Sequence, residues 1–106
     1  MVRNQVESGV IYGLSMIYEK IEIEDGIVQQ RNFDTFPVLR MHQTPEINTI
    51  ILPSQNPPTG IGEIATPPIN AAVSNAIYAA TGTRITHMPL QEGWLAAHTK
   101  SAKETP

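Results

Sequence analysis

The stretch PPTGIGEIATPP, residues 57–68, carries one acidic side chain, Glu63, directly after two glycines and just before an expected helix. Gly60 and Gly62 open backbone conformations closed to other residues and let a ligand approach closely. The partial positive charge at a helix start favours an ionised carboxylate, and a carboxylate fixed on a proline-braced turn can act as a general base. A solvated Glu63 that only complements the helix dipole, worth about 0.3–1 kcal/mol, is the simpler interpretation from the residues alone.

Other site chemistries find little support in the sequence. The run GIGE lacks the third glycine of a dinucleotide fingerprint and the Gly-Lys-Ser/Thr of a P-loop. The chain has no cysteine, which excludes disulfides, thiolate catalysis and iron–sulfur ligation by its own side chains. Its three histidines, His42, His87 and His98, show no ligand spacing, so we expect no metal site built from its residues.

Charge and length limit the partners and the size of the unit. A net charge of −3 without a Lys/Arg cluster argues against nucleic-acid and anionic-membrane surfaces. No apolar run approaches the roughly 18 residues of a membrane span and no apolar leader opens the chain, so we expect a soluble protein. Its compartment, cytoplasm or periplasm of a bacterium, stays open. With 106 residues, the chain is one domain or a piece of one.

The first half of the chain predicts a helix and a hairpin. Apolar residues recur at helical spacing between residues 3 and 19, and these are Val6, Val10, Leu14 and Ile17. Gly9 and Gly13 lie one turn apart in this helix and cost about 1 kcal/mol each relative to Ala, which indicates close packing against another element. The run KIEIEDGIVQQ alternates and turns at Asp25-Gly26, as in a tight β-hairpin.

The second half predicts a strand, a helix and a tail. Residues 47–52 are rich in strand-forming side chains, and residues 67–81 form a helix with Thr66 as its N-cap and Gly82 just past its end. Its apolar stripe consists of Ile69, Val73, Ala76, Ile77 and Ala80. Residues 91–106 lose periodicity, and we expect them to be a flexible tail. The fold class is therefore α+β, in the order helix, β-hairpin, strand, helix.

Several motifs resemble one known family. The stretch PPTGIGEIATPPINAAVSNAIYAATGTRITHMPL is similar to the carboxy-terminal end of molybdenum-binding large subunits in the xanthine dehydrogenase/aldehyde oxidase family, those of isoquinoline 1-oxidoreductase type above all. VRNQVESGVIYGLSMIYEKI resembles the family's Gln-Val-Glu-Gly-Gly helix, and NFDTFPVLRM resembles its Asp-Tyr-Pro-Val-Leu-Arg loop. The motifs keep the family's order over most of the chain, which makes the signal specific.

The resemblance implies roles for particular residues. Glu63 matches the family's active-site glutamate, the base in the hydroxylation of an electron-poor carbon. Gly60, Ile61 and Gly62 match backbone beside the molybdopterin cofactor, and Gln5 matches a glutamine close to it. The residues alone do not decide between that role for Gln5 and an exposed position in the first helical turn. The isolated chain is expected to hold no cofactor.

The sequence also departs from the family pattern. Ser8 replaces the first glycine of a pair, and Ile64 and Ala65 replace a Pro-Gly after the glutamate. Full subunits of the family are several times longer, so we expect residues 2–90 to be the C-terminal segment of a larger molybdopterin-binding domain. Such a segment would expose apolar side chains of its first helix that meet absent neighbours.

Two functions follow as hypotheses. In the first, the chain is the C-terminal portion of a molybdopterin-dependent oxidoreductase acting on aldehydes or nitrogen heteroaromatic compounds. It would work only with the remainder of the molybdenum-binding subunit, an iron–sulfur subunit and a small-molecule substrate. In the second, it is a non-catalytic remnant or a small partner-binding domain without activity of its own.

Overall fold

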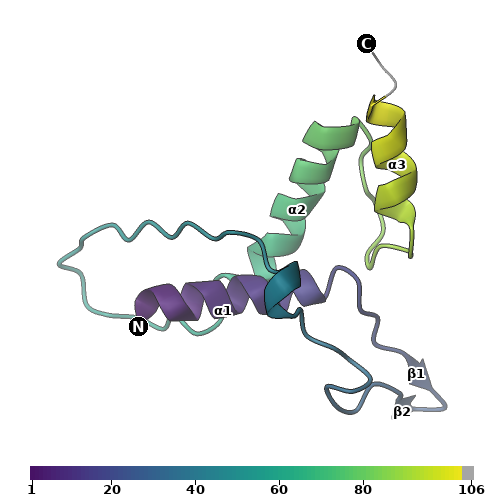
Figure 1. The fold of residues 1–106 in the computed structure, drawn as a ribbon. Coiled ribbons are helices and arrows are strands. Elements are labelled where there is room, and N and C mark those ends of the chain that lie inside the picture. Colours follow the sequence, from purple (N-terminus) through teal and green to yellow (C-terminus); the bar gives the residue numbers. More distant parts are fainter. Residues whose placement is uncertain (104–106) are drawn as a thin grey trace.

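The computed structural model describes residues 1–103 of the chain, and the side chains of residues 1–99. Helices α1 (Val2–Ser15), α2 (Thr66–Thr81) and α3 (Trp94–Lys103), a short 3₁₀ helix η1 (Met41–Gln43) and strands β1 (Ile23–Glu24) and β2 (Ile27–Val28) make up the fold. In Figure 1, α2 rises from α1, α3 runs beside α2, and the hairpin projects away from the helices. The α+β class is confirmed. Membership of a larger domain stays a prediction.

Close packing between α1 and α2 explains the two helical glycines. Both are buried, and a Cβ added to Gly13 would lie 2.2 Å from Cγ2 of Ile69 and 2.9 Å from the carbonyl oxygen of Thr66. A Cβ added to Gly9 would lie 3.0 Å from Cβ of Ala65. The packing predicted for these glycines is thereby confirmed. It fixes the start of α2 against α1, and with it the residues that lead into α2.

The predicted helix ends are partly correct. Gly82 takes a left-handed conformation with φ of 74° and donates its N–H to the Tyr78 carbonyl at 2.7 Å, as expected of a helix terminator. Thr66 is not the N-cap of α2, because it is already helical and Ala65 stands at the cap. The Thr66 hydroxyl instead donates to the Gly9 carbonyl at 3.1 Å. The Thr66 hydroxyl therefore joins α2 to α1, and no side chain among the described residues caps the start of α2.

The hairpin forms as predicted. Ile23 pairs with Val28 and Glu24 with Ile27, in an antiparallel ladder. Asp25 and Gly26 have φ of 51° and 75°, the positive values that a tight type I′ turn requires. All four strand residues are exposed, so the hairpin covers no core of its own.

The strand predicted over residues 47–52 is wrong for this structure. These residues form no strand and lie in the long loop between η1 and α2 (Figure 1). A strand needs a partner, and the described sheet contains only β1 and β2, which pair with each other.

The loss of regular structure expected after residue 90 is also wrong for Trp94–Lys103, which forms α3. Trp94 and Leu95 pack against the buried cluster of Ile17, Ile77 and Leu90, so tertiary contacts help to stabilise this helix. Residues 104–106 of the expected tail lie outside the described residues. The division of the chain at residue 90 stays a prediction.

The core is small and the chain is open. Only Ile17, Ile77 and Leu90 are buried hydrophobic residues in the described part of the chain. The radius of gyration is 16.7 Å, whereas a compact domain of this length has about 13 Å. The helix predicted up to residue 19 ends at Ser15, and Ile17 beyond it is 1% exposed. Val6, Val10 and Leu14 on α1 are half-buried, so the exposed apolar patch expected to include some of these four residues does not include Ile17. Many of the most exposed apolar side chains lie in the hairpin and in the loops.

Candidate active site

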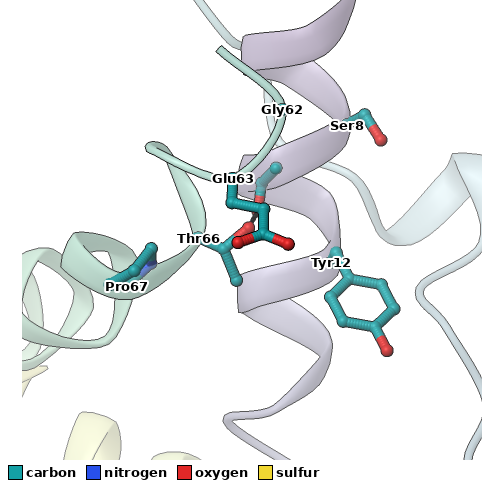
Figure 2. A pocket seen from close by; sticks show the side chains of 7 residues that line it. Ser8, Tyr12, Gly62, Glu63, Thr66 and Pro67 are labelled. Carbon is teal, nitrogen blue, oxygen red and sulfur yellow. Dashed lines mark hydrogen bonds between the residues drawn. The ribbon is translucent and has the colours of Figure 1, made fainter. Parts of the chain in front are cut away.

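A cavity of about 350 Å³ lies where α1 meets the turn before α2 (Figure 2). Its walls come from two segments that are fifty or more residues apart in the sequence. They are Ser8, Gly9 and Tyr12 from α1, and Gly62, Glu63, Thr66 and Pro67 from the turn and the start of α2. Because Thr66 bonds to Gly9 and the helices pack closely, the geometry of this cavity depends on the contact between α1 and α2.

Glu63 is exposed at the edge of this cavity, and its carboxylate is available. Its main-chain carbonyl accepts a hydrogen bond from the Thr66 N–H at 3.1 Å, which fixes the backbone of the turn. Its carboxylate has no hydrogen bond or ion pair with any residue among the described ones. Pro67 and Pro68 have no N–H to offer it. Glu63 therefore lines the cavity and does not cap α2.

The glycines of the turn differ from those of α1. A Cβ added to Gly60 or Gly62 would find nothing within 4 Å, and neither residue has a positive φ. Neither crowding within the described chain nor a left-handed conformation therefore requires glycine at these positions. A group outside this chain that approaches the backbone closely would account for both. This observation fits a bound cofactor or an adjoining polypeptide beside the turn.

The structure brings together some of the predicted site residues. Gly62 and Glu63 line the cavity, and Gly60 and Ile61 lie in the same turn without lining it. Gln5 is exposed on α1, one turn before Gly9, and does not line the cavity either. Its spacing from Gly9 places both residues on the same side of α1. The proposed roles of these residues remain predictions.

The sequence did not indicate the α1 wall of the cavity. Ser8 and Tyr12 are four residues apart and so share one helix face, and this spacing is the signal that could have found them. Within residues 1–103, no cluster of three His, Asp or Glu side chains is placed to hold a metal ion. Nor is any helix in this part of the chain long and apolar enough to cross a membrane.

Comparison with known proteins gives three relatives. The chain is 41% identical over 88 residues, 82% of its length, to the membrane-bound aldehyde dehydrogenase [pyrroloquinoline-quinone] of Gluconacetobacter polyoxogenes. It is 32% identical over 92 residues to the beta subunit of isoquinoline 1-oxidoreductase from Brevundimonas diminuta, and 36% identical over 91 residues to a subunit of the nicotinate dehydrogenase of Pseudomonas putida. These two matches cover 86% and 84% of the chain. No family model matches the chain.

These relatives confirm the resemblance seen in the motifs. The chain belongs to the molybdenum hydroxylase family, the class that contains xanthine dehydrogenase and aldehyde oxidase. Within it, the chain is similar to the large subunits of isoquinoline 1-oxidoreductase type. It spans 11%, 12% and 8% of the lengths of the three relatives, in the order given above.

Proposed function

We propose that this chain supplies the base-bearing turn of a molybdopterin-dependent hydroxylase for aldehydes or nitrogen heteroaromatic compounds. The observation that carries the proposal is the Glu63 carboxylate, which has no partner among the described residues and stands beside a cavity. Glu63 would accept a proton from the attacking oxygen nucleophile. The chain would form the carboxy-terminal portion of a molybdenum-binding subunit and act with the remainder of that subunit.

The residues of the turn fit a large cofactor nearby. Gly60 and Gly62 leave their backbone uncovered, so a group can approach them without meeting a side chain. We assign Gly60, Ile61, Gly62 and Gln5 to cofactor binding, and Glu63 to proton transfer. The molybdenum cofactor would supply the two-electron oxidation, and an iron–sulfur subunit would accept the electrons. Tyr12 and Pro67 line the same cavity as Glu63.

The test is a reconstituted complex of this chain with the remainder of the large subunit and the iron–sulfur subunit. Glu63→Gln keeps the shape and removes the proton acceptor, so turnover should fall about 10²–10⁴-fold while the cofactor content stays the same. Glu46→Gln is the matched control, because Glu46 is an exposed glutamate of the preceding loop that lines no cavity described above. Parental turnover of the Glu63→Gln complex would leave Glu63 as a turn residue only.

The cofactor needs its own test, because the name of the Gluconacetobacter relative specifies pyrroloquinoline quinone. Elemental analysis of the complex should give stoichiometric molybdenum, and extraction should give molybdopterin and no quinone. The isolated chain should contain neither molybdenum nor iron. Stoichiometric quinone without molybdenum in the active complex would refute the cofactor assignment and leave the proton-transfer role of Glu63 to the variant test.

A second candidate function is a partner-binding domain without activity. The small core and the open shape of the chain favour it as a description of the isolated protein. Formation of a stable complex that binds the cofactor but has the same activity with and without Glu63 would favour this candidate.

A further inference from the structure

Residues 47–52, INTIIL, form an apolar segment that no part of the described chain covers fully. Ile50 is 78% exposed, Ile51 is 52% exposed and Leu52 is 80% exposed. No charged residue occurs between Glu46 and Glu63. Exposed strand-like segments in stable proteins usually carry Lys or Pro that prevents pairing, but this segment has neither before Pro53.

The backbone of the same segment has no hydrogen-bond partner within the described chain. Within residues 1–103, no hydrogen bond joins the main chain of residues 47–52 to any other residue. The side-chain oxygen of Thr49 is buried and has no partner. Burial alternates at the start of the segment, with Ile47 and Thr49 half-buried and Asn48 and Ile50 exposed. This alternation and the β-branched side chains are typical of a strand that lacks its neighbour.

We infer that residues 47–52 become a β-strand by pairing with a strand of the larger polypeptide that completes the subunit. The inference rests on the part of the proposed function that makes this chain a portion of a larger subunit, and it does not depend on the role of Glu63. In such a strand Ile50 and Leu52 would point to one face of the sheet, and Ile47, Thr49 and Ile51 to the other. Since both faces carry apolar residues, the strand suits a sheet that is covered on both sides.

The size and shape of the chain indicate which polypeptide supplies the partner strand. The chain spans only 8–12% of the relatives' lengths, so most of each relative has no counterpart here. The radius of gyration of 16.7 Å exceeds the roughly 13 Å of a compact domain, and the segment lies in a loop outside the helical core (Figure 1). When an extended segment adds to a sheet, main-chain hydrogen bonds give affinity, and pockets that receive alternate side chains give specificity. The uncharged segment 47–52 has free main-chain groups for the first and apolar side chains for the second.

The first experiment measures hydrogen exchange of the amides in residues 47–52. The probe is the Brevundimonas diminuta isoquinoline 1-oxidoreductase beta subunit from which the matching 92 residues have been deleted, co-expressed with this chain. In the isolated chain these amides should exchange without protection. In the complex, alternate amides should exchange at least about 100-fold more slowly, because a paired strand donates every second N–H to its neighbour. Failure of the two polypeptides to associate, or unchanged exchange in the complex, would overturn the inference.

The second experiment uses proline to remove one donor. Ile50→Pro and Ile51→Pro occupy adjacent positions, so at least one of them must remove an N–H that the ladder uses, and that variant should raise the Kd of the complex at least about 10-fold. Gln55→Pro is the matched control, since it places a proline in the same loop three residues after the segment, and it should leave the Kd unchanged. Parental affinity of both isoleucine variants would refute the pairing.

Two further outcomes distinguish this inference from pairing with a second copy of the chain and from the proposed function. Protection that appears in the isolated chain as its concentration rises, together with dimers in sedimentation, would assign the segment to a second copy and refute the stated partner. Glu63→Gln should give the same protection as the parent, because Glu63 lies outside the segment. Full protection with activity that does not depend on Glu63 would refute the proposed function and leave the strand pairing intact.

Discussion

Gly13→Ala tests the contact on which the geometry of the candidate site depends. The substitution raises the helix propensity of α1, which alone would stabilise the protein by about 1 kcal/mol. The new Cβ would lie 2.2 Å from Cγ2 of Ile69 and 2.9 Å from the Thr66 carbonyl oxygen, both far inside normal contact distance. Ile69 is stiff at χ1 and the carbonyl belongs to the backbone, so neither atom can simply turn away. The helices would have to separate.

The expected change in the free energy of unfolding is the balance between the gain in helix propensity and the cost of the steric clash. Overpacking of this kind costs about 1–3 kcal/mol, and the separation would also weaken the hydrogen bond from Thr66 to Gly9, worth about 1 kcal/mol. After subtraction of the propensity gain, we expect the free energy of unfolding to fall by about 1–3 kcal/mol. Urea denaturation followed by far-UV circular dichroism measures this change.

Two further variants make the reasoning refutable. Ile69→Ala removes Cγ2, so its combination with Gly13→Ala should destabilise by about 1–2 kcal/mol less than the sum of the single changes. Gly60→Ala is the control, because an added Cβ there meets nothing within 4 Å, and the stability should change by less than about 0.5 kcal/mol. A Gly13→Ala protein that is more stable by about 1 kcal/mol, or strictly additive effects in the double variant, would show that α1 and α2 do not pack as described.

The other stability predictions concern buried side chains. Leu90→Ala should lower the free energy of unfolding by about 2 kcal/mol or more, because Leu90 is 6% exposed. Leu52→Ala, at a position that is 80% exposed, should change it by less than about 0.5 kcal/mol. Equal effects of the two variants in urea denaturation would contradict the described core. Ser15→Ala should cost about 1–3 kcal/mol and speed hydrogen exchange at the Leu39 amide, because the buried Ser15 hydroxyl accepts that N–H at 3.0 Å and donates to the Ile11 carbonyl. Unchanged exchange at Leu39 would show that this bond does not hold the loop.

The candidate site was only partly predictable. The position of Glu63 after a glycine turn and before a helix follows from local sequence, and the family motifs single it out. The α1 wall of its cavity does not follow, because it depends on how α1 and α2 cross. Ser8 and Tyr12 are recognised as lining residues of the cavity only from the arrangement of the two segments in space. The exposure of Gln5 outside the cavity was likewise decided by that arrangement.

The sequence by itself determined the features that local interactions control. The periodicity of apolar residues predicts α1 and α2, and Asp25-Gly26 and Gly82 predict the hairpin turn and the end of α2, because positive φ values restrict the choice of residue at those positions. The family was also evident from motifs in order along the chain.

Tertiary structure decided the features that depend on distant partners. The side chain of Thr66 bonds to α1 instead of capping α2, because the close approach at Gly9 brings a carbonyl within reach. Helix α3 forms where Trp94 and Leu95 meet the small core. Residues 47–52 remain without a ladder despite their strand-forming side chains, because a β-strand exists only when a neighbour supplies the other half of its hydrogen bonds.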